Sequence, residues 1–600
     1  MKKGTLSIHS ENILPIIKKW LYSEKDIFLR ELVANASDAI QKIKLLIASS
    51  QTQAGEKDFR IDITIDKDKK ILSIEDNGIG MTSEEVEKYI AQIAFSGAED
   101  FLKKYKSKNE KDQIIGHFGL GFFSSYMVAK KVEIETLSHE KNAKAVFWSC
   151  DGTTEYTIEK SDRNKVGTKV ILHIDKNNEE FLDENKVKKI LLRYCPYLPF
   201  AIYLNNNHIN NKDPLYLKAP SKCKDSDYLQ FYKELYPFES DPLFWIHLNV
   251  DFPFHLKGIL YFPKITSQFD INKSKIKLFC NRVFVSDNCK DLLPDFLMVL
   301  KGAIDSPDIP LNVSRSFLQM DTTVKSLGQH ISKKISDRLF SFYINEREKF
   351  ISAWKDIEVI IKLGILQDEK FYDRVKKFLI WKNSNDEWTT LEEYISRNKD
   401  KNKEKIFYTH EESKSYLSLY KEKGYEVLHF HPYFDSSLAH ILETKLSCKF
   451  QRIDSSIEED LIDSSKEKDL LDKDGKSERV KMAEFFQSCL SINDLKVEAK
   501  SLVSSSIFGL IQISEEQRRF KDYLKMTNND QAIPLEETFV INTSNKIIEK
   551  TYQLKGKNPD LAKKIANQIY GLARLSQKSL SDKDLEDFIS TSQNVLEKLL

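Results

Sequence analysis

The 600-residue chain lacks the features that mark secreted, membrane and nucleic-acid-binding proteins. Its seven cysteines are spread from Cys150 to Cys489 without a C-x-x-C pair, so neither a disulfide framework nor a zinc site is expected. It carries 92 basic and 91 acidic residues, and this balance gives no field of one sign that would attract nucleic acid. No apolar run reaches membrane-spanning length, and the N-terminus lacks the apolar stretch of a signal peptide. We expect a cytoplasmic protein that binds neither membrane nor nucleic acid.

The pattern of the chain predicts several domains of the α+β class. At 600 residues the chain is too long for one hydrophobic core. Residues 58–66 alternate polar and apolar, which is typical of a half-exposed strand, and 71–74, 131–137 and 168–174 are further strand candidates. Antiparallel strands with helices gathered on one face would form an α+β sandwich. The polar, lysine-rich segment 209–227 is typical of a linker.

A helix near the N-terminus carries a polar face with an unusual composition. Its apolar residues form one stripe between positions 29 and 43, and Glu31, Asn35 and Asp38 lie roughly opposite. A face in contact with solvent is the ordinary explanation for polar residues at this spacing. The polar stripe is flanked by apolar residues, namely Ile27, Phe28 and Ala34. This flanking favours a cleft, but the helix alone leaves both interpretations open.

Two glycine-containing motifs follow this helix. Asp76-Asn-Gly-Ile-Gly80 places a carboxylate at a strand end. A carboxylate only accepts hydrogen bonds and matches a donor such as the amine of adenine, although Asp-Asn-Gly is also a common hairpin turn. Gly116-x-x-Gly119-x-Gly121 precedes the predicted helix 122–128, whose first amides could hold phosphate oxygens. The glycine spacing fits neither a Rossmann nor a Walker motif, and each motif alone is weak evidence.

Together the three motifs resemble the Bergerat ATP-binding fold, which is shared by type II topoisomerases, histidine kinases, mismatch-repair ATPases and the ninety-kilodalton heat-shock chaperones. Residues 21–39, 242–247, 258–263 and 305–315 resemble the heat-shock family in particular. The resemblance is specific from about residue 5 to about residue 320 and looser beyond, and the absence of a long acidic linker suggests the bacterial form. It implies an N-terminal ATP-binding domain (1–208), the linker (209–227), a middle α/β domain (228–485) and a small α+β C-terminal dimerisation domain (486–600).

The resemblance also implies a role for each motif residue. Glu31 would be the general base that activates the attacking water, and Asn35 would bind Mg²⁺ through its amide oxygen. Asp76 would accept from the adenine amine, with Thr168 nearby through a water molecule. The residues that would line the base and the ribose are Asp38, Gly80, Met81 and Phe122.

At the phosphate end, backbone amides of Gly119, Leu120 and Gly121 would hold the oxygens. Arg315 would reach the γ-phosphate from the middle domain, with Gln319 about one turn later on the same face. For Arg315 a surface salt bridge is the alternative. The implied cofactors are ATP and Mg²⁺.

The implied function is that of an ATP-dependent chaperone, a homodimer that hydrolyses ATP slowly and assists unfolded or partly folded clients under stress, alongside other chaperones. Two positions depart from the family pattern Asn-Leu-Gly-Thr-Ile-Ala-Lys-Ser-Gly, because Tyr89 replaces the asparagine and Phe95 replaces the lysine. Loss of one cation near phosphate would weaken binding by about 1–2 kcal/mol. This change leaves open an ATP-binding holdase with little turnover. A DNA-acting relative of the gyrase or mismatch-repair type is the other alternative, and the balanced charge argues against it.

Overall fold

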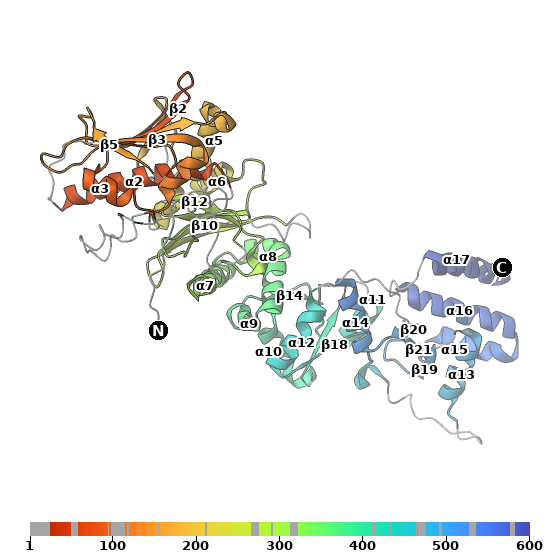
Figure 1. Ribbon diagram of the computed structural model, residues 1–600. Helices are drawn as coiled ribbons and strands as arrows, with labels where there is room; N and C mark the ends of the chain where they lie inside the picture. Colours follow the sequence, from red (N-terminus) through yellow and green to blue (C-terminus); the bar gives the residue numbers. More distant parts are fainter. Residues whose placement is uncertain are drawn as a thin grey trace, which may run out of the picture. The chain divides into compact units, whose positions relative to one another are not determined.

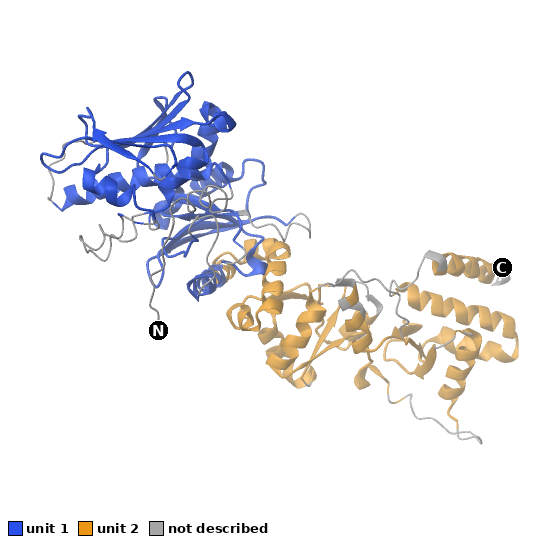
Figure 2. Cartoon of the chain, viewed as in Figure 1, with its two compact units in different colours: residues 1–338 blue, residues 339–600 orange. Residues whose placement is uncertain are grey.

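The computed structural model (Figure 1) describes residues 24–49, 58–93, 95, 97, 115–116, 119–153, 155–210, 213–265, 275–289, 292–312, 322–402, 404–410, 414–431, 434–463, 465, 476–490, 492, 495–526, 536–576 and 582–599. By its contacts the chain divides into two compact units, residues 1–338 and 339–600 (Figure 2). The finer division that the sequence indicates, with boundaries at residues 208, 228 and 486, stays a prediction.

Unit 1 begins with an eight-stranded sheet in the order β5-β4-β3-β6-β2-β1-β7-β8. Neighbouring strands are antiparallel except β1 and β7, which run parallel. The alternation predicted for residues 58–66 is confirmed, because Ile61 and Ile63 are buried while Arg60 and Thr64 are exposed. The strands are β1 (Arg60–Asp66), β2 (Ile71–Asp76), β3 (Ala129–Leu137), β4 (Val146–Cys150), β5 (Thr157–Lys160), β6 (Gly167–Ile174), β7 (Ala201–Leu204) and β8 (Asn207–His208).

Helix α2 (Ile27–Ala48) packs against strands β1 and β2 of this sheet, with α5 (Glu184–Tyr194) beside it (Figure 1). Its predicted apolar stripe is buried, including Leu29, Val33 and Ile40. Each fully buried side chain of this size contributes about 1.5–3 kcal/mol. The predicted α+β class is therefore confirmed. The layer also holds α3 (Ser83–Tyr89), which begins with a capping box at Thr82, and the 3₁₀ helix η4 (Lys176–Leu182).

The helix predicted for residues 122–128 is a 3₁₀ helix, η3 (Gly121–Met127), and not an α-helix. The Ser124 hydroxyl donates to the Gly121 carbonyl oxygen at 2.6 Å, and serine side chains that bond to nearby carbonyls compete with regular helical bonding. Short 3₁₀ pieces are common where a chain must turn tightly. The glycine-rich turn therefore enters the core through one compact 3₁₀ segment.

A second sheet of unit 1 has five strands in the order β12-β11-β13-β10-β9. Strand β9 (Phe244–Val250) forms an antiparallel hairpin with β10. The remaining elements of the unit are β10 (Leu256–Phe262), β11 (Lys275–Cys280), β12 (Val283–Ser286), β13 (Lys301–Asp305), η5 (Leu215–Leu217), η6 (Pro220–Lys222), α6 (Asp225–Leu235), η8 (Asp295–Leu297) and α7 (Thr322–Asn345), which continues seven residues past residue 338.

Unit 2 contains a five-stranded sheet in the order β15-β14-β17-β16-β18. Its strands are β14 (Ile380–Asn383), β15 (Trp388–Thr390), β16 (Lys405–Thr409), β17 (Leu428–His429) and β18 (Lys449–Arg452). Its helices are α8 (Arg347–Gln367), α9 (Glu369–Val375), α10 (Leu391–Asn402), α11 (Lys414–Glu422), α12 (Asp435–Leu446) and η9 (Glu459–Leu461).

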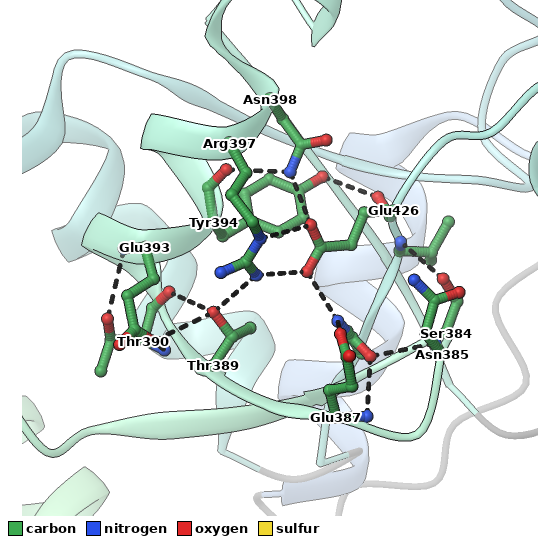
Figure 3. Close-up of polar contacts among 12 residues, drawn as sticks. Ser384, Asn385, Glu387, Thr389, Thr390, Glu393, Tyr394, Arg397, Asn398 and Glu426 are labelled. Atoms are coloured by element: carbon green, nitrogen blue, oxygen red, sulfur yellow. Dashed lines mark hydrogen bonds and ion pairs between the residues drawn. The ribbon is translucent and has the colours of Figure 1, made fainter.

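The buried carboxylate of Glu426 links α10 to the end of β14, from its position two residues before β17 (Figure 3). Glu426 accepts from Arg397 Nη2 at 2.7 Å, from Asn398 Nδ2 at 2.7 Å and from Asn383 Nδ2 at 2.8 Å. Its own carbonyl oxygen accepts from the hydroxyl of Tyr394. Burial alone would raise the pKa of Glu426, but these donors hold that pKa below its usual value. These hydrogen bonds stabilise the packing of α10 against the sheet.

The rest of unit 2 is built on a three-stranded sheet in the order β19-β21-β20. Strand β21 occupies Thr538–Asn542. The other elements are α13 (Glu478–Leu490), β19 (Lys496–Lys500), β20 (Gly509–Gln512), α14 (Glu515–Met526), α15 (Lys546–Gln553), η11 (Leu554–Gly556), α16 (Pro559–Ser576) and α17 (Asp582–Leu599).

Candidate functional site

The polar face of α2 is not an ordinary solvated face. Glu31 is 3% exposed and Asp38 is similarly buried, whereas Asn35, which lies between them on the same face, is exposed. Charged side chains are seldom buried unless they are paired. The two carboxylates therefore need partners, and each has a different one.

Glu31 is paired with its sequence neighbour Arg30. Arg30 Nη2 and Nε both donate to Glu31 Oε1, at 2.8 Å and 3.1 Å, and both side chains are almost fully buried. The other carboxylate oxygen, Oε2, lies against the glycine-rich turn, because a Cβ placed on Gly121 would be 2.6 Å from it. Any side chain at position 121 would push the carboxylate away. The arrangement keeps a charged carboxylate beside the start of η3.

Asp38 fixes the chain that leads into the same turn. Its Oδ1 accepts the backbone N–H of Ile115 at 2.8 Å, and its Oδ2 accepts that of Gly116 at 2.6 Å. Both carboxylate oxygens thus hold main-chain groups that lie far away in the sequence. The sequence assigns Asp38 to the base and ribose, and the structure places it where it anchors the entry to the glycine-rich turn.

Asp76 stands at the end of β2 and is only 6% exposed. Its Oδ1 accepts the N–H of Gly78 at 2.8 Å. Burial raises the pKa of Asp76 to about 7, although the Gly78 N–H and the charge of Arg163 act in the opposite direction. A carboxylate has about four lone-pair positions. Asp76 can therefore accept further bonds from a donor that enters this dry site.

A hydroxyl relay links the loop after Asp76 to the neighbouring strands. The N–H of Met81 donates to Thr136 Oγ1 at 2.9 Å. The hydroxyl oxygens of Thr136 and Thr168 lie 2.9 Å apart, and Thr168 is paired with Asp76 in the β2–β6 register. The structure therefore brings Asp76, Met81 and Thr168 together, as the sequence predicts. Thr136 completes the group, and nothing in its local sequence distinguishes it from any polar strand residue.

Two glycines in the site adopt a positive φ angle, a backbone conformation that residues with a side chain rarely adopt. Gly80 has φ +66°, and a Cβ there would lie 1.9 Å from the carbonyl oxygen of Leu137. Gly119 has φ +62°, and a Cβ there would meet the backbone of Phe95 at 2.5 Å. Both close approaches leave main chain where side chains would otherwise project. At these two positions the site therefore presents main chain, which suits a ligand held by main-chain amides.

The comparisons with known proteins agree with this geometry. Residues 23–180 match a family model described as histidine kinase-, DNA gyrase B- and HSP90-like ATPase, and residues 204–600 match the model of the Hsp90 protein family. The chain belongs to the Hsp90 family. The Hsp90 match over the larger part of the chain separates it from the DNA-acting ATPases, so that alternative is wrong.

Relatives from several bacteria support the assignment to Hsp90. The chaperone protein HtpG of Bacteroides fragilis strain YCH46 is 43% identical over 548 residues, which cover 87% of this chain and 80% of that protein. The HtpG chaperones of Bacteroides thetaiotaomicron and of Porphyromonas gingivalis strain ATCC 33277 are 42% and 41% identical, and each alignment covers 92% of this chain and 84% of the relative. The chain is thus a chaperone of the bacterial HtpG type, with an Hsp90-like ATPase domain.

The two departures from the Hsp90 pattern lie together beside the glycine-rich turn. The rings of Tyr89 and Phe95 are 6.4 Å apart. Lys88 places its Nζ 5.1 Å from the centre of the Tyr89 ring and 5.3 Å from that of Phe95. Phe95 is 41% exposed, and its backbone contacts Gly119. A cation therefore remains close to the position where the family has a lysine, although it comes from the end of α3.

Several expected features lie beyond what the structure describes or are placed differently. Arg315 and Gln319 are outside the described residues. Phe122 is buried and packs edge-on against Trp148 at 5.7 Å, so its ring belongs to the wall behind the site. No motif in the sequence singles out Arg30, which is distinguished there only by its position next to Glu31.

Two features that would indicate further partners are absent from the described part of the chain. No group of three or more histidine, cysteine, aspartate or glutamate side chains in it could hold a metal ion. No helix in it combines the length and apolar composition needed to cross a bilayer.

Proposed function

We propose that the site in unit 1 binds ATP with Mg²⁺ and hydrolyses ATP slowly, and that this cycle drives the chaperone activity. The observation that carries the proposal is the pairing of two buried carboxylates with two glycine-lined segments. Asp76 lies beside the Gly78–Gly80 loop, and Glu31 lies beside Gly121. One carboxylate suits the donor edge of a purine, and the other suits a water molecule near the phosphates.

At the purine end, Asp76 accepts the exocyclic amine of adenine, and the loop of Gly78 and Gly80 gives the flat base room. The Thr136–Thr168 hydroxyl pair orders the neighbouring polar groups. The charged form of a buried aspartate whose pKa is close to 7 is poorly stabilised by its protein donors alone, and a further donor would stabilise it. A ligand amine would supply one.

At the phosphate end, main-chain amides of the turn 119–121 face the nucleotide, and Asn35 holds Mg²⁺ through its amide oxygen. When bound, Mg²⁺ neutralises part of the phosphate charge. Glu31 takes a proton from the attacking water, and the two hydrogen bonds from Arg30 orient that carboxylate. Arg315, with Gln319, would complete the site from the middle domain, which would make turnover depend on domain movement.

The other predicted partners are a second copy of this chain, client proteins and other chaperones. Exposed apolar side chains lie along α17 at Leu585, Ile589 and Leu596, which supports a homodimer formed through the C-terminal helices. ATP binding and hydrolysis would close and open this dimer around unfolded or partly folded clients. Cooperation with other chaperones and a cytoplasmic location stay predictions.

Phosphate release by the full-length protein and by Glu31→Gln tests the ATPase. We expect Glu31→Gln to lose hydrolysis by about 100-fold or more, since general-base catalysis contributes about 10²–10⁴, while calorimetric ADP affinity stays within about threefold. Asn35→Ala, which changes the same helix face, should weaken binding itself. Equal phosphate release by wild type and Glu31→Gln would reject turnover. Suppression of client aggregation without turnover would then identify a holdase, the function suggested by Phe95 and Tyr89.

A further inference from the structure

A groove in unit 2 runs between helix α13 and strand β19, which pack side by side (Figure 1). Its volume is about 510 Å³. On one side it is lined by Val480, Ala483 and Gln487, which recur at helical spacing along one face of α13. On the other side it is lined by the strand, including Val497 and Ala499. A helix and a strand edge therefore form its two walls.

Strand β19 lies at the edge of its sheet, because the strand order is β19-β21-β20. It pairs in parallel with β21, and the N–H of Lys496 donates to the carbonyl oxygen of Glu537 at 3.2 Å. At the other end the N–H of Thr543 donates to the carbonyl oxygen of Lys500 at 3.0 Å. Main-chain groups of alternate residues point to opposite sides of a strand. Those of residues 496, 498 and 500 thus face β21, and those of Val497 and Ala499 face the groove.

Within the described part of the chain, no group bonds to the groove-facing N–H and C=O of Val497 and Ala499. Main-chain groups at a sheet edge are a ready template for another strand. Helices and strands satisfy most such groups internally. Here they line a groove and remain available to a partner.

Just beyond the end of β19, the same edge already pairs with another segment of the chain through an isolated bridge. Ile462 and Leu502 form an antiparallel bridge. The N–H of Asp463 donates to the carbonyl oxygen of Ser501 at 2.8 Å, and the N–H of Val503 donates to the carbonyl oxygen of Leu461 at 3.1 Å. The main-chain groups of Ser501 and Val503 thus point away from β21. They continue the alternation in which the main-chain groups of Val497 and Ala499 also point away from β21. A strand that continues this pairing antiparallel would run directly into the groove.

The size and chemistry of the groove define the kind of strand that fits. The stretch of α13 from Val480 to Gln487 rises about 10 Å at 1.5 Å per residue, which equals about three residues of extended chain at 3.3 Å each. Val480 is 45% exposed and offers an apolar contact. Charges of both signs, on Glu484 and Lys500, stand at the lining, so neither acidic nor basic strands are preferred. The groove therefore fits a short, extended, apolar segment, whatever the charge of the residues that flank it.

We propose that this groove binds an extended segment of an unfolded client chain, which adds to β19 as an antiparallel strand beside α13. Main-chain bonds to Val497 and Ala499 supply affinity that is independent of sequence, and the α13 face supplies an apolar contact. Such recognition suits a chaperone, whose clients share an exposed main chain and apolar side chains. The inference rests on the proposed handling of unfolded clients and gives that function a site.

Substitution of the groove-facing amide tests the site in the full-length protein. Ala499→Pro removes that N–H while leaving the β21-facing bonds in place, and proline is tolerated at an edge with its nitrogen outward. Ala499→Ser keeps the N–H and is the matched control. The probe is fluorescein-labelled, reduced and carboxymethylated lactalbumin, which cannot refold, and fluorescence anisotropy reports its binding. We expect Ala499→Pro to weaken binding at least tenfold and Ala499→Ser to remain within twofold of wild type. Equal affinity of the proline variant and wild type overturns the site.

Residue-resolved hydrogen exchange gives a second measurement that needs no variant. In the free protein the amides of Val497 and Ala499 should exchange at least 100-fold faster than those of Glu498 and Lys500, and the probe should slow them. Slow exchange before the probe is added would show that the chain itself or a second copy occupies the edge, and it refutes the proposal. Probe binding without slowing places clients elsewhere and leaves the chaperone function intact. No probe binding by wild type would reject both.

Discussion

Replacing Asp76 by asparagine should have opposite effects on stability and on nucleotide binding. Burial raises the pKa of this carboxyl from 3.8 to about 7, so the folded protein holds the proton more tightly than the unfolded chain does. By linkage, the contribution of this carboxyl to the free energy of unfolding is greatest at low pH. It falls as the pH rises from about 4 to about 7, and it stays constant above pH 7. The rise in pKa corresponds to about 4 kcal/mol. Asparagine resembles the protonated acid and avoids this loss.

At pH 8 we therefore expect Asp76→Asn to unfold at a higher temperature than wild type when no nucleotide is present. The gain should approach about 4 kcal/mol, less what the charged bond from the Gly78 N–H contributes. At pH 5 the gain should be smaller, about 1–2 kcal/mol, because the folded carboxyl is still protonated there while the unfolded one is already mostly ionised.

Nucleotide affinity, in contrast, should fall in the Asp76→Asn variant. In the variant the amide oxygen would keep the bond from the Gly78 N–H, so the amide NH₂ would face the exocyclic amine of adenine. Two donors would then meet without an acceptor. Each buried unsatisfied group costs about 1–3 kcal/mol, so ADP affinity should fall about 100-fold or more.

Differential scanning calorimetry at pH 5 and pH 8 measures the first effect, and isothermal titration with ADP and Mg²⁺ measures the second. In a chain of several domains, the transition that ADP shifts in wild type marks the domain that holds the site. A lower unfolding temperature for Asp76→Asn at pH 8, or ADP affinity equal to that of wild type, would refute the reasoning.

Three further substitutions probe separate contacts. Arg30→Met should lower the free energy of unfolding by about 3–5 kcal/mol and reduce phosphate release, because Glu31 would stay buried without its cation; Arg30→Lys, the control, should lose less in both assays, and unchanged values for Arg30→Met would count against the pair. Phe95→Lys should tighten ATP binding about tenfold with little change for ADP, as measured by calorimetry, and no gain would mean that position 95 does not face the γ-phosphate. Lys362→Met should destabilise unit 2 by about 3–5 kcal/mol in denaturant unfolding, because the buried Lys362 bonds to Asp435 at 2.9 Å; ADP affinity should not change, and a stable variant would contradict this account.

The sequence predicted the parts of the fold that depend on local pattern. Alternation placed β1, and the spacing of apolar residues placed the buried face of α2. Motif order and the resemblance assigned Glu31 and Asp76 to one site, but the pattern of the helix left open whether Glu31 lies in solvent or in a cleft. Those motifs are short and contiguous, so their geometry is largely determined by neighbouring residues.

The long-range contacts of the site could not be predicted in this way. Asp38 bonds to Ile115 and Gly116, which are 77 and 78 residues away, and only the closed fold brings them together. Thr136 enters the site because β3 lies next to β6. Residues 121–127 form a 3₁₀ helix because a serine hydroxyl bonds to a carbonyl of the turn, a competition that apolar periodicity does not reveal.

The most direct test of the central claim is a crystal structure of the protein with ADP and Mg²⁺. We expect the exocyclic amine of adenine within about 3 Å of the Asp76 carboxylate, with the phosphates on the amides of the turn 119–121. A nucleotide bound elsewhere, or with its base turned away from Asp76, would contradict it.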